Sequence, residues 1–263
     1  MSLRRLLLTA LPKVALSRAC GVLCGLPLPR PLRPRLYRWF ARRYGADLAD
    51  VQGDLADFAS LQAFFRRPLR AGARSVAATS LVWPCDGRIV TIGPLTDGRI
   101  EQVKGQTYGL ADLLGDSGLA AALAGGNQAT IYLAPGDYHR VHSPWRAAIE
   151  SVTYVPGTLF PVNPPAVRCI RDLFARNARF VFRCRLPDGT PAALVMVGAY
   201  NVGGTRITRR DGTVAPGEEV GQFGFGSTVV ALVGPGGPAF APLPPEQRVR
   251  MGGAAIASPA PTA

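Results

Sequence analysis

The chain has 263 residues, of which 48% are hydrophobic, so it can bury one sizeable core and is not a disordered chain. Its 30 glycines and 24 prolines favour short strands joined by turns and argue against a helical bundle. The formal net charge of +13 indicates a polyanionic partner, either nucleic acid or a membrane with anionic lipids.

The N-terminal segment supplies most of this charge. Residues 1–45 contain no acidic residue and ten basic ones: Arg4, Arg5, Lys13, Arg18, Arg30, Arg33, Arg35, Arg38, Arg42 and Arg43. Leucine-rich runs lie between them, but none approaches the roughly eighteen residues of a membrane span. Pro12 and Lys13 also interrupt the apolar stretch that a secretory signal would need.

Residues 1–48 are therefore predicted to form amphipathic helices that lie on an anionic membrane surface. Their leucines would enter the acyl boundary and their arginines would meet the lipid head groups. An ordinary amphipathic helix packed on the domain is the alternative. No recognised nucleic-acid-binding module accompanies the charge, so we expect no nucleic-acid partner.

Residues 49–251 are predicted to form a mainly β domain of the α+β class, with a β-sandwich or barrel-like arrangement. A helix is expected over residues 55–66, with two shorter ones near 110–114 and 119–124. Strand-like runs occur at residues 88–92, 99–103, 129–133, 148–155, 179–186, 193–197 and 227–233. The alternation within 179–186 is typical of a half-exposed strand. The Ala-, Pro- and Gly-rich residues 252–263 are expected to be disordered.

The cysteines do not form a metal-binding or redox motif. There are five of them, Cys20, Cys24, Cys85, Cys169 and Cys184, and no two form a C-x-x-C pair. An odd, scattered set in a chain of this length predicts reduced thiols and a protein that faces the cytoplasm.

The two histidines of the chain, His139 and His142, both lie in the segment APGDYHRVHSP. Pro135 and Pro144 bracket them, so a loop or a very short strand is expected here. Their i, i+3 spacing without an intervening Glu differs from the zinc-protease pair. Histidine titrates near neutral pH, so the pair favours acid–base chemistry. A zinc site with a distant third ligand and two plain surface histidines are the alternatives.

Two further polar residues are candidates for chemistry. Asp86 lies in WPCDGRI, where Asp-Gly is also a common turn dipeptide. Ser227 lies in GEEVGQFGFGSTVV, between a glycine-rich stretch and the last apolar strand. Asp, His and Ser are the components of a nucleophilic triad. A G-x-S-x-G elbow is absent, so the sequence does not indicate an ordinary serine hydrolase.

From Phe64 to Leu232 the chain resembles the pyruvoyl-dependent phosphatidylserine decarboxylases. The resemblance is carried, in chain order, by FFRRPLRAGAR, PCDGRI, VKGQTYGLADLLG, LAPGDYHRVHSP, GTLFPVNP, LFARN, VGAYNVG and GEEVGQFGFGSTVV. The block that holds both histidines is the most specific. The chain departs from the family at Phe225, where Leu is usual, at Ala178, where Glu is common, and at the variable Cys85. Ala178 puts in doubt any role of that Glu.

The resemblance implies that the chain cuts itself between Gly226 and Ser227. The Ser227 hydroxyl would attack the Gly226 carbonyl, with His142 as the base and Asp86 orienting His142. Elimination and loss of ammonia would then turn Ser227 into a pyruvoyl group, the covalent cofactor. The products would be a large chain of 226 residues and a small chain of 37.

The resemblance further implies that this enzyme, a carboxy-lyase, decarboxylates phosphatidylserine to phosphatidylethanolamine and CO2. The pyruvoyl group would form a Schiff base with the substrate amine and act as the electron sink. His139 would protonate the product carbanion, with His142 as the alternative. A peripheral position on the cytoplasmic face of the cell inner membrane is expected. Whether the protein forms a homodimer stays open.

Three other functions remain open from the sequence. The first is a pyruvoyl decarboxylase that acts on another amino acid or serine lipid. The second is a zinc hydrolase that uses His139 and His142. The third is a membrane-binding β domain that has kept the motif without the activity.

Overall fold

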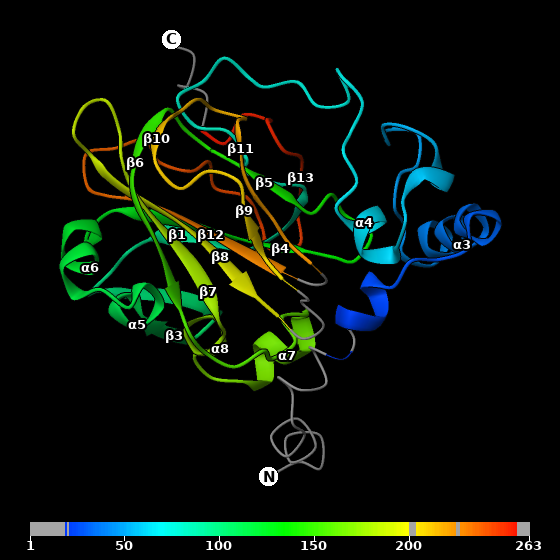
Figure 1. Ribbon diagram of the computed structural model, residues 1–263. Coiled ribbons are helices and arrows are strands. Elements are labelled where there is room, and N and C mark those ends of the chain that lie inside the picture. Colours follow the sequence, from blue (N-terminus) through cyan, green and yellow to red (C-terminus); the bar gives the residue numbers. More distant parts are fainter. Residues whose placement is uncertain (1–18, 20, 200–203, 225–226, 257–263) are drawn as a thin grey trace.

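The computed structural model describes residues 19, 21–199, 204–224 and 227–256 (Figure 1). Its centre is an eight-stranded sheet with the order β10-β6-β7-β8-β12-β4-β1-β13. The strands are β1 (Gly87–Pro94), β4 (Asn127–Leu133), β6 (Ala147–Val155), β7 (Arg179–Arg185), β8 (Pro191–Gly198), β10 (Gly212–Val214), β12 (Ser227–Val233) and β13 (Arg248–Val249). Every neighbouring pair is antiparallel.

Strand β12 lies near the middle of this sheet and is fully buried along its length. It pairs with β4 on one edge and with β8 on the other over all seven residues. The β-branched and apolar side chains of its sequence, STVVALV, suit a strand that is covered on both faces. The sequence prediction of a strand at residues 227–233 is confirmed.

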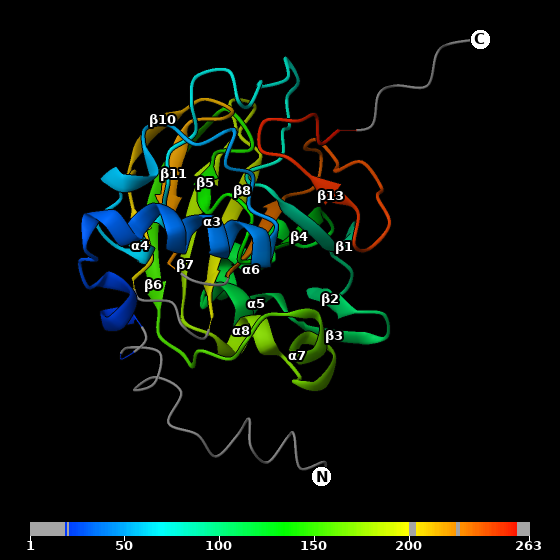
Figure 2. The ribbon, with the colours of Figure 1, turned by 90° about the vertical axis from the view of Figure 1, so that its right-hand side faces the viewer.

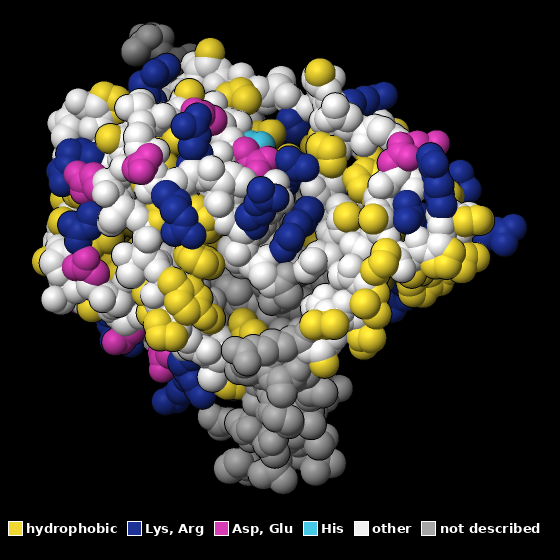
Figure 3. Space-filling model, in the orientation of Figure 1, with side chains coloured by type: hydrophobic (Ala, Val, Ile, Leu, Met, Phe, Trp, Pro, Cys, Tyr) yellow, Lys and Arg dark blue, Asp and Glu magenta, His cyan; other side chains and the backbone are white. Residues whose placement is uncertain are grey.

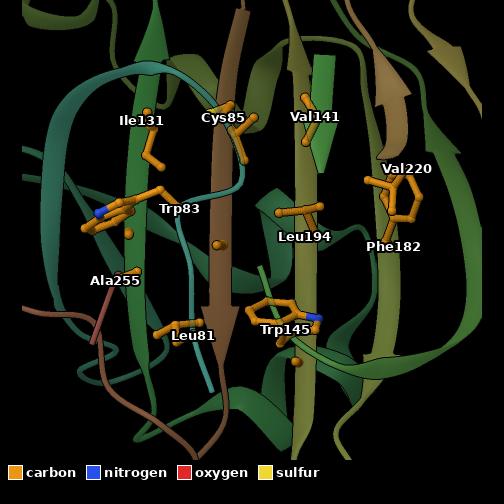
Figure 4. Close-up of a cluster of buried hydrophobic side chains, with 14 of the residues drawn as sticks. Leu81, Trp83, Cys85, Ile131, Val141, Trp145, Phe182, Leu194, Val220 and Ala255 are labelled. Atoms are coloured by element: carbon orange, nitrogen blue, oxygen red, sulfur yellow. The ribbon is translucent and has the colours of Figure 1, made fainter. Parts of the chain in front are cut away.

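Both faces of the sheet are covered by separate hydrophobic cores. On β12, Val229 and Ala231 belong to one core, whereas Val230 and Leu232 belong to the other. The first core, shown in Figure 4, packs the sheet against the segment around Trp83 and against the second sheet. The alternation of one strand between two cores is the period-two geometry of a sheet interior.

Helices and a hairpin cover the other face (Figure 1). These are α5 (Leu110–Leu114), α6 (Ser117–Leu123), α7 (Pro164–Cys169), α8 (Leu173–Arg176) and the β2–β3 hairpin (Arg99–Val103 and Gln106–Gly109). The expected half-exposed strand at residues 179–186 is found only in its second half, where Arg183 is half-buried and Arg185 exposed, and is wrong for the first half. Val181 on β7 is buried towards the helices, and Phe182 is buried in the first core. Even Arg179 is 3% exposed, because backbone carbonyls such as those of Leu113 and Ala175 accept its guanidinium hydrogens.

A second, three-stranded sheet lies on the first core in the order β5-β11-β9. Its strands are β5 (Arg140–His142), β11 (Glu219–Gln222) and β9 (Arg206–Ile207). The α+β class is confirmed, and the two sheets make a sandwich on this side. The barrel expectation is not met, because β10 and β13, the two edges of the large sheet, do not pair with each other in the part of the chain that the structure describes.

The N-terminal part of the described chain forms a small helical unit beside the sheets (Figure 2). It contains η1 (Arg30–Leu32), α3 (Arg33–Tyr44), η2 (Leu55–Asp57) and α4 (Leu61–Phe65). Its core holds Tyr37, which stacks on Phe64 with ring centroids 4.5 Å apart, together with Phe40 and Phe65. No helix of the described residues is long and apolar enough to cross a membrane.

Two expectations about element limits need correction. The single helix expected over 55–66 is two short ones, because Asp54 caps η2 and Ser60 caps a new start at α4. The expected disorder from residue 252 is wrong for residues 252–256. Ala255 is buried in the first core, and its amide donates to the Leu81 carbonyl at 3.0 Å. Residues 257–263 lie outside the described part of the chain.

Candidate active site

The site is built where β12 begins. Ser227 is its first residue and pairs with Leu133, the last residue of β4, and with Gly198, the last residue of β8. Its side chain is completely buried, and its Oγ has no hydrogen-bond partner among the residues that the structure describes. Gly226, the other half of the expected cleavage site, lies outside the described residues.

The chain that leaves β4 returns immediately as the histidine segment. Strand β5 begins seven residues after Leu133, and it pairs with β11 through contacts such as His142 with Glu219. The Phe223 amide, four residues before Ser227, donates to the His139 carbonyl at 2.9 Å. Pairing and hydrogen bonding thus bring both histidines to the end of the sheet at which Ser227 lies. The prediction of a very short strand for this segment is confirmed.

His142 is held by hydrogen bonds at both ring nitrogens. Its Nδ1 is 2.9 Å from the Gly217 carbonyl oxygen, which can only accept, so Nδ1 carries the hydrogen. The lone pair therefore lies on Nε2, which is 3.2 Å from the Tyr138 hydroxyl. Burial lowers the pKa of His142, so the ring is neutral at neutral pH and able to accept a proton. Burial also raises the pKa of Tyr138 to about 12, which keeps its hydroxyl protonated.

His139 has no exposed surface and only one hydrogen-bonded nitrogen. Its Nδ1 donates to the Asp137 carbonyl at 2.8 Å, and its buried Nε2 has no partner within the described ranges. Its ring lies against Phe65, with centroids 3.9 Å apart. Burial, with a smaller contribution from the charge of nearby Arg67, lowers the pKa of His139 to about 3. The Nε2 lone pair of His139 therefore accepts no hydrogen bond from a described residue, and the ring lies in apolar surroundings.

Asp86 does not contact His142. Its carboxylate accepts from Arg74, with Nε to Oδ1 at 3.0 Å and the second nitrogen to Oδ2 at 2.5 Å, and from the Met251 amide at 2.9 Å. The expected orientation of His142 by Asp86 is not found among the described residues, because the Nδ1 hydrogen of His142 is donated to the Gly217 carbonyl. Asp86 still influences His142, since its charge opposes the lowering of the pKa of that ring.

Three residues of the candidate site were not identified from the sequence. Arg74 joins Asp86 to Asp50, which lies 2.7 Å from the same guanidinium. The Tyr138 hydroxyl donates a hydrogen bond to Nε2 of His142. Arg67, which is 2% exposed, donates to the Asp137 carbonyl that also accepts from His139. Each lies in a motif that carried the family resemblance, which is the signal that could have found them.

A cavity of about 100 Å3 lies beside these groups and is lined by Arg67, Asp86, Asp137 and Tyr138, among others. Nε and one terminal nitrogen of Arg67 have no partner. Within the described ranges no group of three or more His, Cys, Asp or Glu side chains could hold a metal ion. A zinc hydrolase built on the two histidines therefore finds no third ligand there.

Comparison with known proteins gives the same family as the motifs. The family model described as phosphatidylserine decarboxylase matches residues 61–257. A phosphatidylserine decarboxylase proenzyme from Anaeromyxobacter sp. (strain K) is 44% identical over 268 residues, with 93% of this chain and 94% of the relative covered. Proenzymes of the same name from Xanthomonas oryzae pv. oryzae (strain MAFF 311018) and Pseudomonas aeruginosa (strain PAO1) are 43% and 42% identical. They cover 78% and 79% of this chain, and 81% and 80% of their own lengths are covered.

These similarities extend over the sheet and every candidate site residue. The chain is an enzyme of the carboxy-lyase class. It belongs to the phosphatidylserine decarboxylase family.

Proposed function

We propose that this protein is made as a precursor that cuts itself between Gly226 and Ser227 and then decarboxylates phosphatidylserine to phosphatidylethanolamine and CO2. The observation that carries the proposal is the Ser227 hydroxyl. It is buried, it has no partner in the described part of the chain, and it lies at the first residue of a strand that is fixed on both edges. The word proenzyme in the names of the relatives supports a precursor that is processed.

Self-cleavage uses groups of the chain alone. Ser227 Oγ attacks the Gly226 carbonyl carbon while His142 Nε2 accepts the hydroxyl proton, which moves the acyl group from nitrogen to oxygen. For this step His142 must exchange its hydrogen bond from Tyr138 for one from Ser227. Loss of the Ser227 α-hydrogen then breaks the Cβ–O ester bond. Residue 226 becomes a carboxylate, and residue 227 becomes an enamine.

Water completes the conversion of residue 227. The enamine tautomerises to an imine, and hydrolysis replaces its nitrogen by oxygen and releases ammonia. The resulting pyruvoyl group fits the position, because it needs no side-chain ligand and the backbone of β12 holds it from both sides. When formed, this group supplies an electrophilic carbonyl that takes up the substrate amine and accepts the electrons released as CO2 leaves.

In the second reaction we assign proton transfer to His139. Its Nδ1 hydrogen is committed to the Asp137 carbonyl, so the proton it delivers must first be taken up at Nε2. An anionic substrate close to the ring favours this uptake, because a negative charge raises the pKa of a buried histidine. Arg67, which shares the Asp137 carbonyl, holds the segment in place and keeps the ring neutral before substrate binds.

The substrate is a membrane lipid, and we propose that the N-terminal unit docks the enzyme on the anionic cytoplasmic face of the inner membrane. Hydrophobic side chains gather on one side of the molecule, over α3 and the residues before it (Figure 3). Val22, Leu23 and Leu26 are 65%, 67% and 51% exposed, and Trp39 is 53% exposed. Exposed arginines flank Trp39 on α3, as in a helix that lies at the membrane interface.

Two measurements test the function together. The intact mass of the purified protein should show a 226-residue chain and a 37-residue chain that begins with a pyruvoyl group. The same preparation should release CO2 from phosphatidylserine in mixed micelles. A single chain of full precursor mass would leave the alternative of a membrane-binding β domain. Cut chains that decarboxylate only free serine or another soluble amino acid would support the other pyruvoyl decarboxylases.

A further inference from the structure

The end of β8 that lies beside Ser227 is held by a side chain and not by a neighbouring strand. The register between β7 and β8 ends at Val197, one residue before the end of β8. Gly198, the last residue of β8, still pairs with Ser227 on its other edge. Its amide donates to the Ala178 carbonyl at 2.9 Å, whereas its carbonyl accepts from Nδ2 of Asn177 at 2.8 Å. The Asn177 side chain therefore supplies a hydrogen bond that the next strand residue would otherwise make.

Asn177 follows α8 directly, has no exposed surface and uses its full hydrogen-bonding capacity. Its Nδ2 donates a second hydrogen bond to the Phe160 carbonyl at 2.9 Å. Its Oδ1 accepts from the Phe160 amide at 2.9 Å and from the Thr158 hydroxyl at 3.3 Å. A side-chain amide has two donor hydrogens and two acceptor lone pairs, so all four are used. The side chain thus joins the GTLFPVNP segment to the end of β8.

The backbone around Asn177 is packed closely, which fixes the direction of its side chain. The Thr158 amide donates to the Arg176 carbonyl at 2.8 Å. Gly157 lies so close to this turn that a Cβ there would collide with the Arg176 carbonyl oxygen. A residue held in this way has one preferred side-chain conformation, so Nδ2 presents its hydrogen to Gly198 from a fixed position.

The other neighbour of Ser227, strand β4, is fixed at its end in a comparable way. Directly after β4, the Ala134 amide donates to Oδ2 of Asp137 at 2.7 Å, and the Asp137 amide donates to the Ala134 carbonyl at 2.9 Å. Strand ends open locally more easily than strand centres. A side-chain hydrogen bond at the end of each flanking strand opposes such opening at the level of Ser227.

We propose that Asn177 is a positioning residue for both reactions at residue 227. The inference rests on the proposed function and adds to it a residue that acts through Gly198. By holding the Gly198 carbonyl, Asn177 fixes the edge of β8 beside Ser227 before cleavage, and beside the pyruvoyl group afterwards. A displacement of about 1 Å at a reacting group can lower a rate by about 10²-fold. Loss of the Asn177 donor therefore lowers the rates of both reactions and leaves substrate binding unchanged.

Gln102 is a matched control, because it is a buried amide with similar bonds in another place. It is 1% exposed. Its Nε2 donates to the carbonyls of Val167 and Ile170, both at 2.7 Å, and its Oε1 accepts from the Leu173 amide at 2.8 Å. These partners belong to α7, to α8 and to the chain between them, not to the strands beside Ser227. Asn177→Asp and Gln102→Glu each keep the shape of the side chain and remove its donation to two carbonyls.

The experiment measures rate and stability separately. Self-cleavage is followed by gel during cell-free synthesis, and Asn177→Asp should slow it by about tenfold or more, whereas Gln102→Glu should cleave at close to the wild-type rate. For dioctanoyl phosphatidylserine, kcat per pyruvoyl group should fall by a similar factor in Asn177→Asp alone, with KM unchanged. Urea denaturation in the uncut Ser227→Ala background should show a comparable loss of stability for both substitutions. A purely structural role would not separate the two positions.

A second pair, Asn177→Ala and Gln102→Ala, repeats the comparison without a buried carboxyl group. Folded Asn177 variants that cleave and decarboxylate like their Gln102 counterparts overturn the proposal. Asn177 variants that are unfolded under conditions in which the Gln102 variants are folded also overturn it, because the residue is then structural. A wild-type enzyme that is uncut or inactive overturns the proposed function itself.

Discussion

The surroundings of His139 and His142 differ although the two residues are only three positions apart. His142 has both ring nitrogens occupied, by the Gly217 carbonyl and the Tyr138 hydroxyl. His139 has one nitrogen occupied and an unpartnered, fully buried Nε2. The ring of His142 is therefore oriented from both sides, whereas His139 has a buried nitrogen that no described residue occupies. This difference in surroundings is the basis on which we propose separate roles for the two histidines in two successive reactions.

The largest effect is expected when Ser227 is replaced, because both proposed reactions take place at this residue. Ser227→Ala should leave one uncut chain without decarboxylase activity, because neither the ester nor the cofactor can form. Thr228→Val is the matched control. The Thr228 hydroxyl is also buried without a hydrogen-bond partner among the described residues, and valine has the same shape. Mass spectrometry should show two chains for Thr228→Val. Cleavage in Ser227→Ala would refute the assignment of the nucleophile.

The histidines themselves should separate the two reactions. His142→Ala should slow self-cleavage by about 10²-fold or more, the usual contribution of a general base. His139→Ala should still yield two chains, but its decarboxylation rate per pyruvoyl group should fall by about the same factor. Cleavage is followed by gel and activity by released CO2. If His139→Ala stays uncut while His142→Ala cuts itself, the roles are reversed.

Substitution of Asp86 tests the comparison further, because its carboxylate is hydrogen-bonded to Arg74 and not to His142. Asp86→Asn should prevent cleavage and lower the free energy of unfolding by about 3 kcal/mol, as expected when one partner of a buried ion pair is lost. Arg74→Met breaks the same pair but keeps the carboxylate. Cleavage in Arg74→Met alone would support an electrostatic action of Asp86 on His142. Equal loss of cleavage in both variants would indicate that Asp86 acts only through its ion pair with Arg74.

The smallest expected effect is on the pH dependence of the free energy of unfolding. The pKa of His139 is lowered, so in acid the unfolded chain binds a proton that the folded chain does not. The free energy of unfolding should therefore fall as pH drops from about 6.5 towards 3, by at most about 1.4 kcal/mol per pH unit for this residue. Urea denaturation of uncut Ser227→Ala protein measures this slope. Adding His139→Gln should make the slope shallower, and an unchanged slope would contradict the burial of a neutral ring.

Strands with a regular pattern could be predicted from sequence, and short elements could not. The run at residues 227–233 and the helix Leu110–Leu114 agree with the structure, because their apolar patterns specify them locally. β9 and β13 have two residues each, too few for any periodicity, and they exist through pairing with distant segments such as β11. The burial of Val181 depended on helices elsewhere in the chain, which the alternation of one strand cannot reveal.

The candidate site shows the same limit. The motifs brought Asp86, His139, His142 and Ser227 to attention, and the structure brings the histidines and Ser227 to one end of the sheet. The sequence did not reveal that Arg74 holds Asp86, since nothing in the eleven residues between them indicates a contact. Hydrogen-bond partners on the backbone, such as the Gly217 carbonyl, have no side-chain signature at all.

The position of β12 also bears on the state of the protein after it has been cut. Because β4 and β8 both bond to this strand along its whole length, the small chain is inserted into the sheet and not appended to it. Its later residues extend the attachment, with Val249 on β13 and Ala255 in the core. With the cleavage that we propose, the mature enzyme is a heterodimer whose subunits share one folding unit. Neither subunit could leave without denaturation of the other, so the peptide break would not appear as a dissociation equilibrium.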